Sequence, residues 1–163
     1  MENLQSLMNH LESCMRDHVG AQNRMITLLE EQERCVLEER PAAVELATQA
    51  LSAELRTVPE RTARRDKILA RFALAWGVAA GSLTLSSVAD RFGAGESGGD
   101  SGKLRELRDE LREATAKCMR LNRRVSALVR LHRRVMLDVI DSLLSDEEND
   151  PMRETGTLLS AEA

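Results

Sequence analysis

A seven-residue repeat of uncharged side chains runs through the last third of the chain and leaves few choices for its fold. Two positions of each heptad carry Leu104, Leu111, Cys118, Val125, His132 and Val139 on one row, and Leu107, Ala114, Leu121, Leu128 and Val135 on the other. Residues three and four apart lie on one face of a helix, so the two rows form one stripe. The repeat predicts a helix over residues 102–145 that packs against other helices.

Residues 3–39 carry a broader version of the same repeat. Its rows are Leu4, Leu11, His18 and Met25; Leu7, Cys14, Ala21, Leu28 and Cys35; and Met8, Met15, Leu29 and Val36. A stripe of this width can face two neighbouring helices. Arg40-Pro41 is expected to end this helix, because the residue before proline disfavours the helical conformation and proline fits the first turn of the next helix.

Residues 41–77 form a second predicted long helix, followed by a short one. Pro59 predicts a kink or break near Thr57, which could cap the restart. A short helix is expected over 85–92, capped by Thr84. The aromatic residues all fall between 72 and 92 and are expected to close one end of the bundle. The inward positions of the long helix are Val44, Ala47, Leu51, Leu55, Val58, Ile68, Leu69, Phe72 and Trp76.

Composition agrees with an all-helical chain, since there is no Tyr and only two Phe and one Trp, whereas strands favour aromatic residues. We therefore predict an all-α fold: an elongated up-down bundle or antiparallel coiled coil of three long helices and one short helix. One helical domain is expected over residues 1–145, with a flexible glycine-rich loop at 93–102. Asp100 or Ser101 is expected to cap the last helix, and the polar tail 146–163 is expected to be disordered.

The sequence offers no catalytic or metal-binding motif, so we expect neither an enzyme nor a cofactor. Three cysteines without a short paired spacing argue against disulfides and zinc ribbons. His18 and His132 lie on helix seams, where we interpret them as polar residues that fix register and not as metal ligands. The N-terminus does not resemble a signal peptide, and no stretch of 18 apolar residues occurs. A cytoplasmic location without membrane insertion is the expectation.

Residues 117–134 contain seven basic residues and no acidic one. Because each lies off the seam, we interpret the stretch first as a solvated face. The alternative is an electrostatic docking patch for an acidic protein. Nucleic acid is the least favoured partner, since aromatic residues and a basic net charge are lacking. The candidate patch comprises Arg123, Arg124, Arg130, Arg133 and Arg134.

The end of the last helix is apolar on almost every side. Leu131, Leu137, Ile140 and Leu144 lie outside the seam, so a bundle that covers only the seam would leave them exposed together. Such a patch usually marks an interaction site. Cover by the second helix or by a homodimer partner is the alternative. The candidate partner-binding residues are Leu128, Leu131, Val135, Met136, Leu137, Val139, Ile140, Leu143 and Leu144, with Leu158 and Leu159 of the tail as a second anchor.

Three stretches resemble the FlgN-type flagellar export chaperones. They are LLEEQERCVLEERPAAVELATQALSAEL, GSLTLSSVADRFG and LREATAKCMRLNRRVSALVRLHRRVMLDVIDSLL. The Leu121-Asn122 pair matches the family pattern, whereas Val125 stands where a second Asn is usual. Pro59 and Ala50-Leu51 also depart from the pattern. The resemblance covers roughly residues 20–145.

This resemblance implies a small cytoplasmic chaperone of the flagellar type III export system. Such proteins bind the hook–filament junction proteins FlgK and FlgL, prevent their early assembly and deliver them to FlhA at the export gate. The client contact is implied for the C-terminal region, residues 128–163. The alternative hypothesis is a structural coiled-coil protein that homo-oligomerises or scaffolds another assembly, and a weak homodimer is left open in either case.

Overall fold

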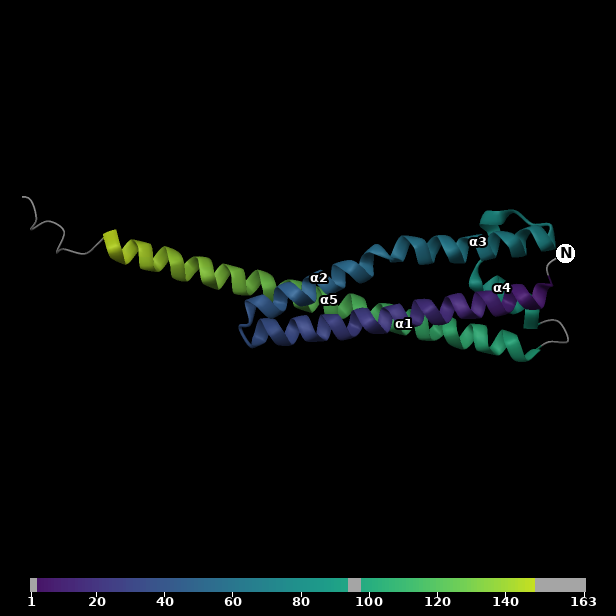
Figure 1. Cartoon of the computed structure of the whole chain (residues 1–163), viewed down its shortest axis with the longest axis horizontal. Helices are drawn as coiled ribbons and strands as arrows, with labels where there is room; N and C mark the ends of the chain where they lie inside the picture. Colours follow the sequence, from purple (N-terminus) through teal and green to yellow (C-terminus); the bar gives the residue numbers. More distant parts are fainter. Residues whose placement is uncertain (1–2, 94–97, 149–163) are drawn as a thin grey trace, which may run out of the picture. The chain divides into compact units, whose positions relative to one another are not determined.

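The structure is a computed structural model that describes residues 3–93 and 98–148 (Figure 1). It divides into two compact units, Met1–Val125 and Ser126–Ala163. The last helix, α5 (Gly98–Glu148), belongs to both units.

Unit 1 is built from helices that run back and forth. Helix α1 (Leu4–Leu37) is followed by α2 (Pro41–Arg56) and α3 (Val58–Trp76), which return along it (Figure 1). Side-chain hydrogen bonds show that α2 and α3 run antiparallel to α1. As the residue number increases along α1, the number of its bonding partner decreases: Asp17–Arg64, Arg24–Glu54 and Gln32–Thr48. The order continues unchanged across the break between α2 and α3.

Helix α5 runs in the same direction as α1 within unit 1. Lys117 forms an ion pair of 3.0 Å with Glu30, and Arg124 pairs with Glu33 further along both helices. Ala114, Leu121 and Val125 share one apolar cluster with two residues of α1, Ile26 and Leu29. The described residues contain no strand. The predicted all-α, up-down architecture is therefore confirmed.

The larger apolar cluster lies where α1 begins and includes short helix α4 (Leu85–Gly93). Phe72 lies with its ring centroid 5.1 Å from that of Trp76 and 5.8 Å from that of Phe92, so the aromatic residues gather as expected. Thr84 caps α4 as predicted. Its Oγ1 accepts from the backbone N–H of Ser87, and the Ser87 hydroxyl accepts from the N–H of Thr84, a reciprocal capping box.

The turn between α1 and α2 uses Glu39 in the left-handed region, with φ of 55°. The N–H of Glu39 donates to the carbonyl of Val36, and the N–H of Arg40 donates to that of Cys35. These two bonds form a Schellman motif, which satisfies the last carbonyls of α1. The chain can then restart at Pro41, so the predicted helix end near Arg40-Pro41 lies close to the observed one.

The break at Thr57 corrects two expectations. Pro59 has no N–H for the carbonyl of Leu55, so the helix is interrupted near the expected place. However, the Thr57 hydroxyl does not cap α3, because it donates backward to the carbonyl of Glu54. Leu55 was expected inward and is 50% exposed. The inward position belongs instead to Glu54, which receives hydrogen bonds from Arg24 and Arg61.

The glycine-rich segment also differs from the prediction. Residues 98–102 are helical, and α5 starts at Gly98, ahead of the two expected caps, Asp100 and Ser101. Glycine is tolerated in the first turn of a helix, where the backbone N–H groups have no partner within the helix. Residues 94–97 and the predicted tail from residue 149 onward lie outside the described residues.

Candidate protein-binding surface

Burial along the seam of α5 ends near the boundary of the two units. Leu104, Leu121 and Val125 are buried, and Leu128 is half-buried. The next seam residues, His132, Val135 and Val139, are exposed. His132 is therefore exposed and does not occupy the buried register-fixing position that the heptad pattern predicted.

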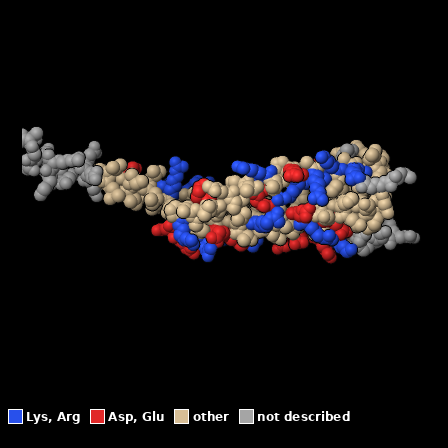
Figure 2. All heavy atoms as spheres, viewed as in Figure 1, with Lys and Arg blue, Asp and Glu red and all other residues tan. Residues whose placement is uncertain are grey.

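The described side chains of unit 2 form a continuous apolar surface on α5. Eight large apolar residues are between 46% and 63% exposed: Leu131, Val135, Met136, Leu137, Val139, Ile140, Leu143 and Leu144. A helix shades part of each of its own side chains, so exposure near one half is what a helix without packed neighbours leaves. Figure 2 shows this end of α5, at the left of the view, as mostly uncharged atoms.

This surface extends around most of the helix. At about 100° per residue, the apolar side chains occupy an arc of roughly 240°. Arg133 interrupts the arc, and the other charged residues of the segment share the remaining sector: Arg130, Arg134, Asp138 and Asp141. A helix that packs against one neighbour needs a stripe of only about 100°. The arc is therefore wide enough for more than one partner helix.

Most of the predicted partner-binding residues lie on this surface. Leu128 is half-buried at its start, and Leu158 and Leu159 lie outside the described residues. Val129, which is 41% exposed, was missed although it stands seven residues before Met136 on the same side of the helix. Within the candidate docking patch every arginine is exposed, but Arg124 pairs with Glu33 inside unit 1.

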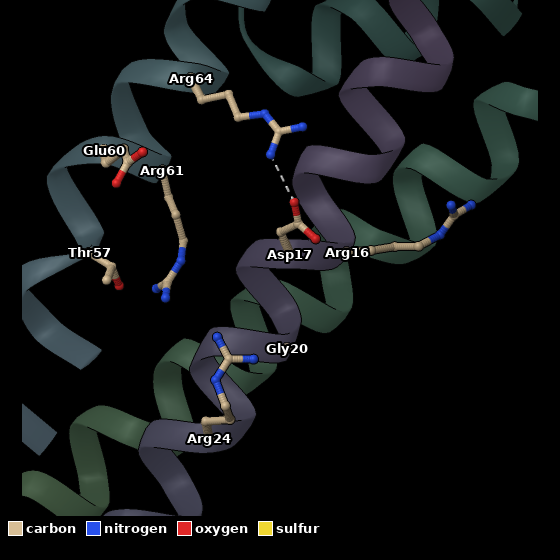
Figure 3. Close-up of a pocket in the computed structure, with 8 residues that line it drawn as sticks. All are labelled: Arg16, Asp17, Gly20, Arg24, Thr57, Glu60, Arg61 and Arg64. Atoms are coloured by element: carbon tan, nitrogen blue, oxygen red, sulfur yellow. Dashed lines mark hydrogen bonds and ion pairs between the residues drawn. The ribbon is translucent and has the colours of Figure 1, made fainter. Parts of the chain in front are cut away.

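Unit 1 contains a cleft of about 430 Å³ between α1 and α3, lined mostly by charged and polar side chains (Figure 3). Figure 3 shows basic side chains around it, with Arg64 joined to Asp17 at 3.1 Å. The other arginines of the lining also have carboxylate partners: Arg16 with Glu12, and Arg24 and Arg61 with Glu54. Three of these ion pairs, Arg64–Asp17, Arg24–Glu54 and Arg61–Glu54, join different helices, so the charged residues of the cleft hold α1, α2 and α3 together.

Glu54 lies near the break between α2 and α3 and forms ion pairs with both neighbouring helices. It accepts from Nη2 of Arg24 at 2.9 Å and from Arg61. The hydrogen bond from Arg24 is the largest cause that lowers the pKa of the Glu54 carboxyl group. Nearby, Nε2–H of His18 donates to the carbonyl of Arg61 at 3.1 Å. His18 thus acts as a half-buried polar contact that fixes the pairing of α1 with α3.

Glu54→Gln should reduce the free energy of unfolding by roughly 1 kcal/mol at pH 7, because a neutral amide loses the ion pairs of a partly exposed site. A carboxyl group with a lowered pKa stabilises the fold above its unfolded pKa, and this contribution is lost as the pH falls through the folded value. The folded value lies below 4.5. Urea unfolding at pH 7 and pH 3 should therefore show a difference in free energy of unfolding between the two proteins that is smaller at pH 3 than at pH 7. An equal difference in the free energy of unfolding at both pH values would contradict the proposal that the charge of Glu54 stabilises the fold.

The three cysteines do not form a reactive site. Burial is the largest cause that raises the pKa of the thiols of Cys14, Cys35 and Cys118. A raised pKa keeps a thiol protonated at neutral pH, and the protonated form is a poor nucleophile and metal ligand. Among the described residues, no group of three or more His, Cys, Asp or Glu side chains could hold a metal ion.

In the part of the chain that the structure describes, no helix is long and apolar enough to cross a membrane. Comparison with known protein families, with curated proteins and with solved structures finds no match to this chain. Among the described residues, the exposed apolar surface of α5 is the feature that is suited to binding another protein.

Proposed function

We propose that this chain is a cytoplasmic export chaperone for the flagellar hook–filament junction proteins FlgK and FlgL. The observation that carries the proposal is the exposed apolar surface of α5 between Leu131 and Leu144. A patch of this extent is uncommon on a protein that acts alone. The resemblance of the three quoted stretches to FlgN-type chaperones supplies the class of client.

Recognition would follow the helix-in-groove mode, in which an amphipathic client segment lays its apolar face on the helix. Full burial of one aliphatic side chain contributes roughly 1.5–3 kcal/mol. About half of each side chain is already shaded, so a client gains about half of that amount per residue. Ordering of a flexible client segment opposes binding. The expected complex is therefore of moderate affinity and can release its client without a chemical step.

Met136 lies in the middle of this surface. Its unbranched, polarizable side chain can adapt to partners of different shape, which suits a protein with two clients. Around the apolar residues, the exposed Arg130, Arg133 and Arg134 could contact acidic side chains of a client. Delivery to FlhA at the export gate is part of the proposal and is implied by the resemblance alone.

The proposal predicts that Leu137→Gln, Ile140→Gln and Leu144→Gln together abolish co-purification with FlgK or FlgL. Glutamine keeps a good helix propensity and removes apolar surface, so the fold should persist. Leu46→Gln, Leu55→Gln and Leu74→Gln together form the matched control, because these leucines are equally or more exposed but lie on α2 and α3. Pull-down with purified FlgK and FlgL measures binding, and circular dichroism measures helix content.

The control variant should retain binding. If the α5 variant also retains it, the client contacts another surface and the assignment of the site is wrong. If neither junction protein binds the unaltered chain, the assignment of the client class is wrong.

A further inference from the structure

We propose that a second copy of this chain packs antiparallel on one face of α5, centred on Val135. This face is formed by Leu131, Val135 and Val139, which are all about half exposed. The order of the charged residues beside it favours this partner. The inference goes beyond the proposed function and does not depend on the identity of a client.

The charges of this segment change sign along the helix. Arg130 and Arg134 come first, and Asp138 and Asp141 follow. At about 100° per residue, these four residues share a sector of roughly 80° that borders the Leu131–Val135–Val139 face. All four are exposed. The stripe is thus basic in its first half and acidic in its second.

The charges of such a stripe complement those of the same stripe on a second helix that runs in the opposite direction. In an antiparallel pair related by a two-fold axis, the same flank of each helix meets. With the axis at Val135, Leu131 lies opposite Val139 of the second copy, and Arg134 lies close to Asp138 of the second copy. In a parallel two-fold pair the charged flank of each helix would instead meet the opposite flank of the second copy, which carries Met136, Ile140 and Leu143, so no ion pair would form. The charges therefore select the antiparallel arrangement.

The expected dimer is weak. The segment from Leu128 to Leu144 is only about 25 Å long, and a pair of helices of this length buries less than the roughly 1,200 Å² of a standard stable interface. Association should therefore depend on protein concentration and weaken as salt screens the charges. Met136, Ile140 and Leu144 lie largely outside this interface, so apolar surface remains for another protein.

Charge exchange on the full-length chain tests the pairing. Arg134→Asp and Asp138→Arg should each weaken dimerisation by roughly tenfold, because each replaces two attractive contacts with repulsive ones. The double variant Arg134→Asp/Asp138→Arg should dimerise like the unaltered chain. An equimolar mixture of the two single variants should also dimerise, since both cross-pairs are then of opposite charge. Sedimentation velocity over a concentration series measures each constant.

Arg112→Asp is the matched control, because Arg112 is an exposed residue of α5 within unit 1. It should leave association unchanged, and circular dichroism should show equal helix content in all variants. A chain that stays monomeric at every concentration overturns the proposal. Failure of both the double variant and the mixture to restore a dimer overturns the antiparallel register. Neither result bears on the pull-down with FlgK and FlgL, so the two proposals fail separately.

Discussion

Phe72→Ala is expected to lower the free energy of unfolding by about 3–5 kcal/mol, the usual range for removing a buried aromatic ring. Phe72 is completely buried and contacts both other aromatic residues, Trp76 and Phe92. Its ring joins α3 to α4 within the larger apolar cluster. A cavity at this point removes packing from two helices at once, and α4 is too short to be stable alone.

Urea unfolding followed by circular dichroism measures the loss. Leu74→Ala is the control, since Leu74 lies two residues away on the same helix and is 84% exposed. This change should stay within about 0.5 kcal/mol of the unaltered protein. Comparable losses in the two variants would contradict the placement of Phe72 at the centre of the cluster.

The long helices and their inward faces could be predicted because apolar periodicity reports burial directly. Every residue of the three predicted rows of α1 is buried or half-buried. The rows were incomplete, however, because Glu12 and Gln32 are buried as well. Gln32 donates to Thr48 on α2, a partner that no pattern within α1 reveals. Periodicity within one helix therefore does not predict a polar residue such as Gln32 that is buried by pairing with another helix.

The break between α2 and α3 shows a second limit. Pro59 predicted the break in the helix. It did not predict that Leu55 is exposed, because Glu54 takes the inward position and accepts hydrogen bonds from Arg24 and Arg61. Glu54, Arg24 and Arg61 lie on three different helices, so the preference for glutamate over leucine is a tertiary effect. The start of α5 at Gly98 was also not predicted, because five glycines in ten residues predict a loop by composition alone.

The candidate site could be predicted from the sequence because this segment has more apolar residues than a helix seam needs. Residues 131–144 carry apolar side chains outside the seam as well as on it. The sequence could not decide whether another part of the chain covers them, since that depends on how far the neighbouring helices extend. The structure gives these side chains as exposed. The seam residues of α5 are therefore buried or half-buried up to Val125 and exposed from His132 to Val139.

Leucine-to-alanine changes at two positions of α5 provide a direct test of where its packing ends. Leu104→Ala should lower the free energy of unfolding by about 2–5 kcal/mol, because Leu104 is fully buried in the larger apolar cluster. Leu137→Ala should change it by no more than about 0.5 kcal/mol, since alanine favours the helix and an exposed side chain leaves no cavity. Urea unfolding at low protein concentration measures both changes.

Leucine-to-alanine changes at Leu104 and Leu137 should thus differ in their effect on stability, because Leu104 is buried and Leu137 is exposed. Removal of Leu137 should even reduce concentration-dependent aggregation, because exposed apolar surface promotes association. A large loss of stability from Leu137→Ala would mean that Leu137 is covered within its own chain. The apolar surface of α5 would then be part of the core, and the argument for a protein partner at this surface would fail.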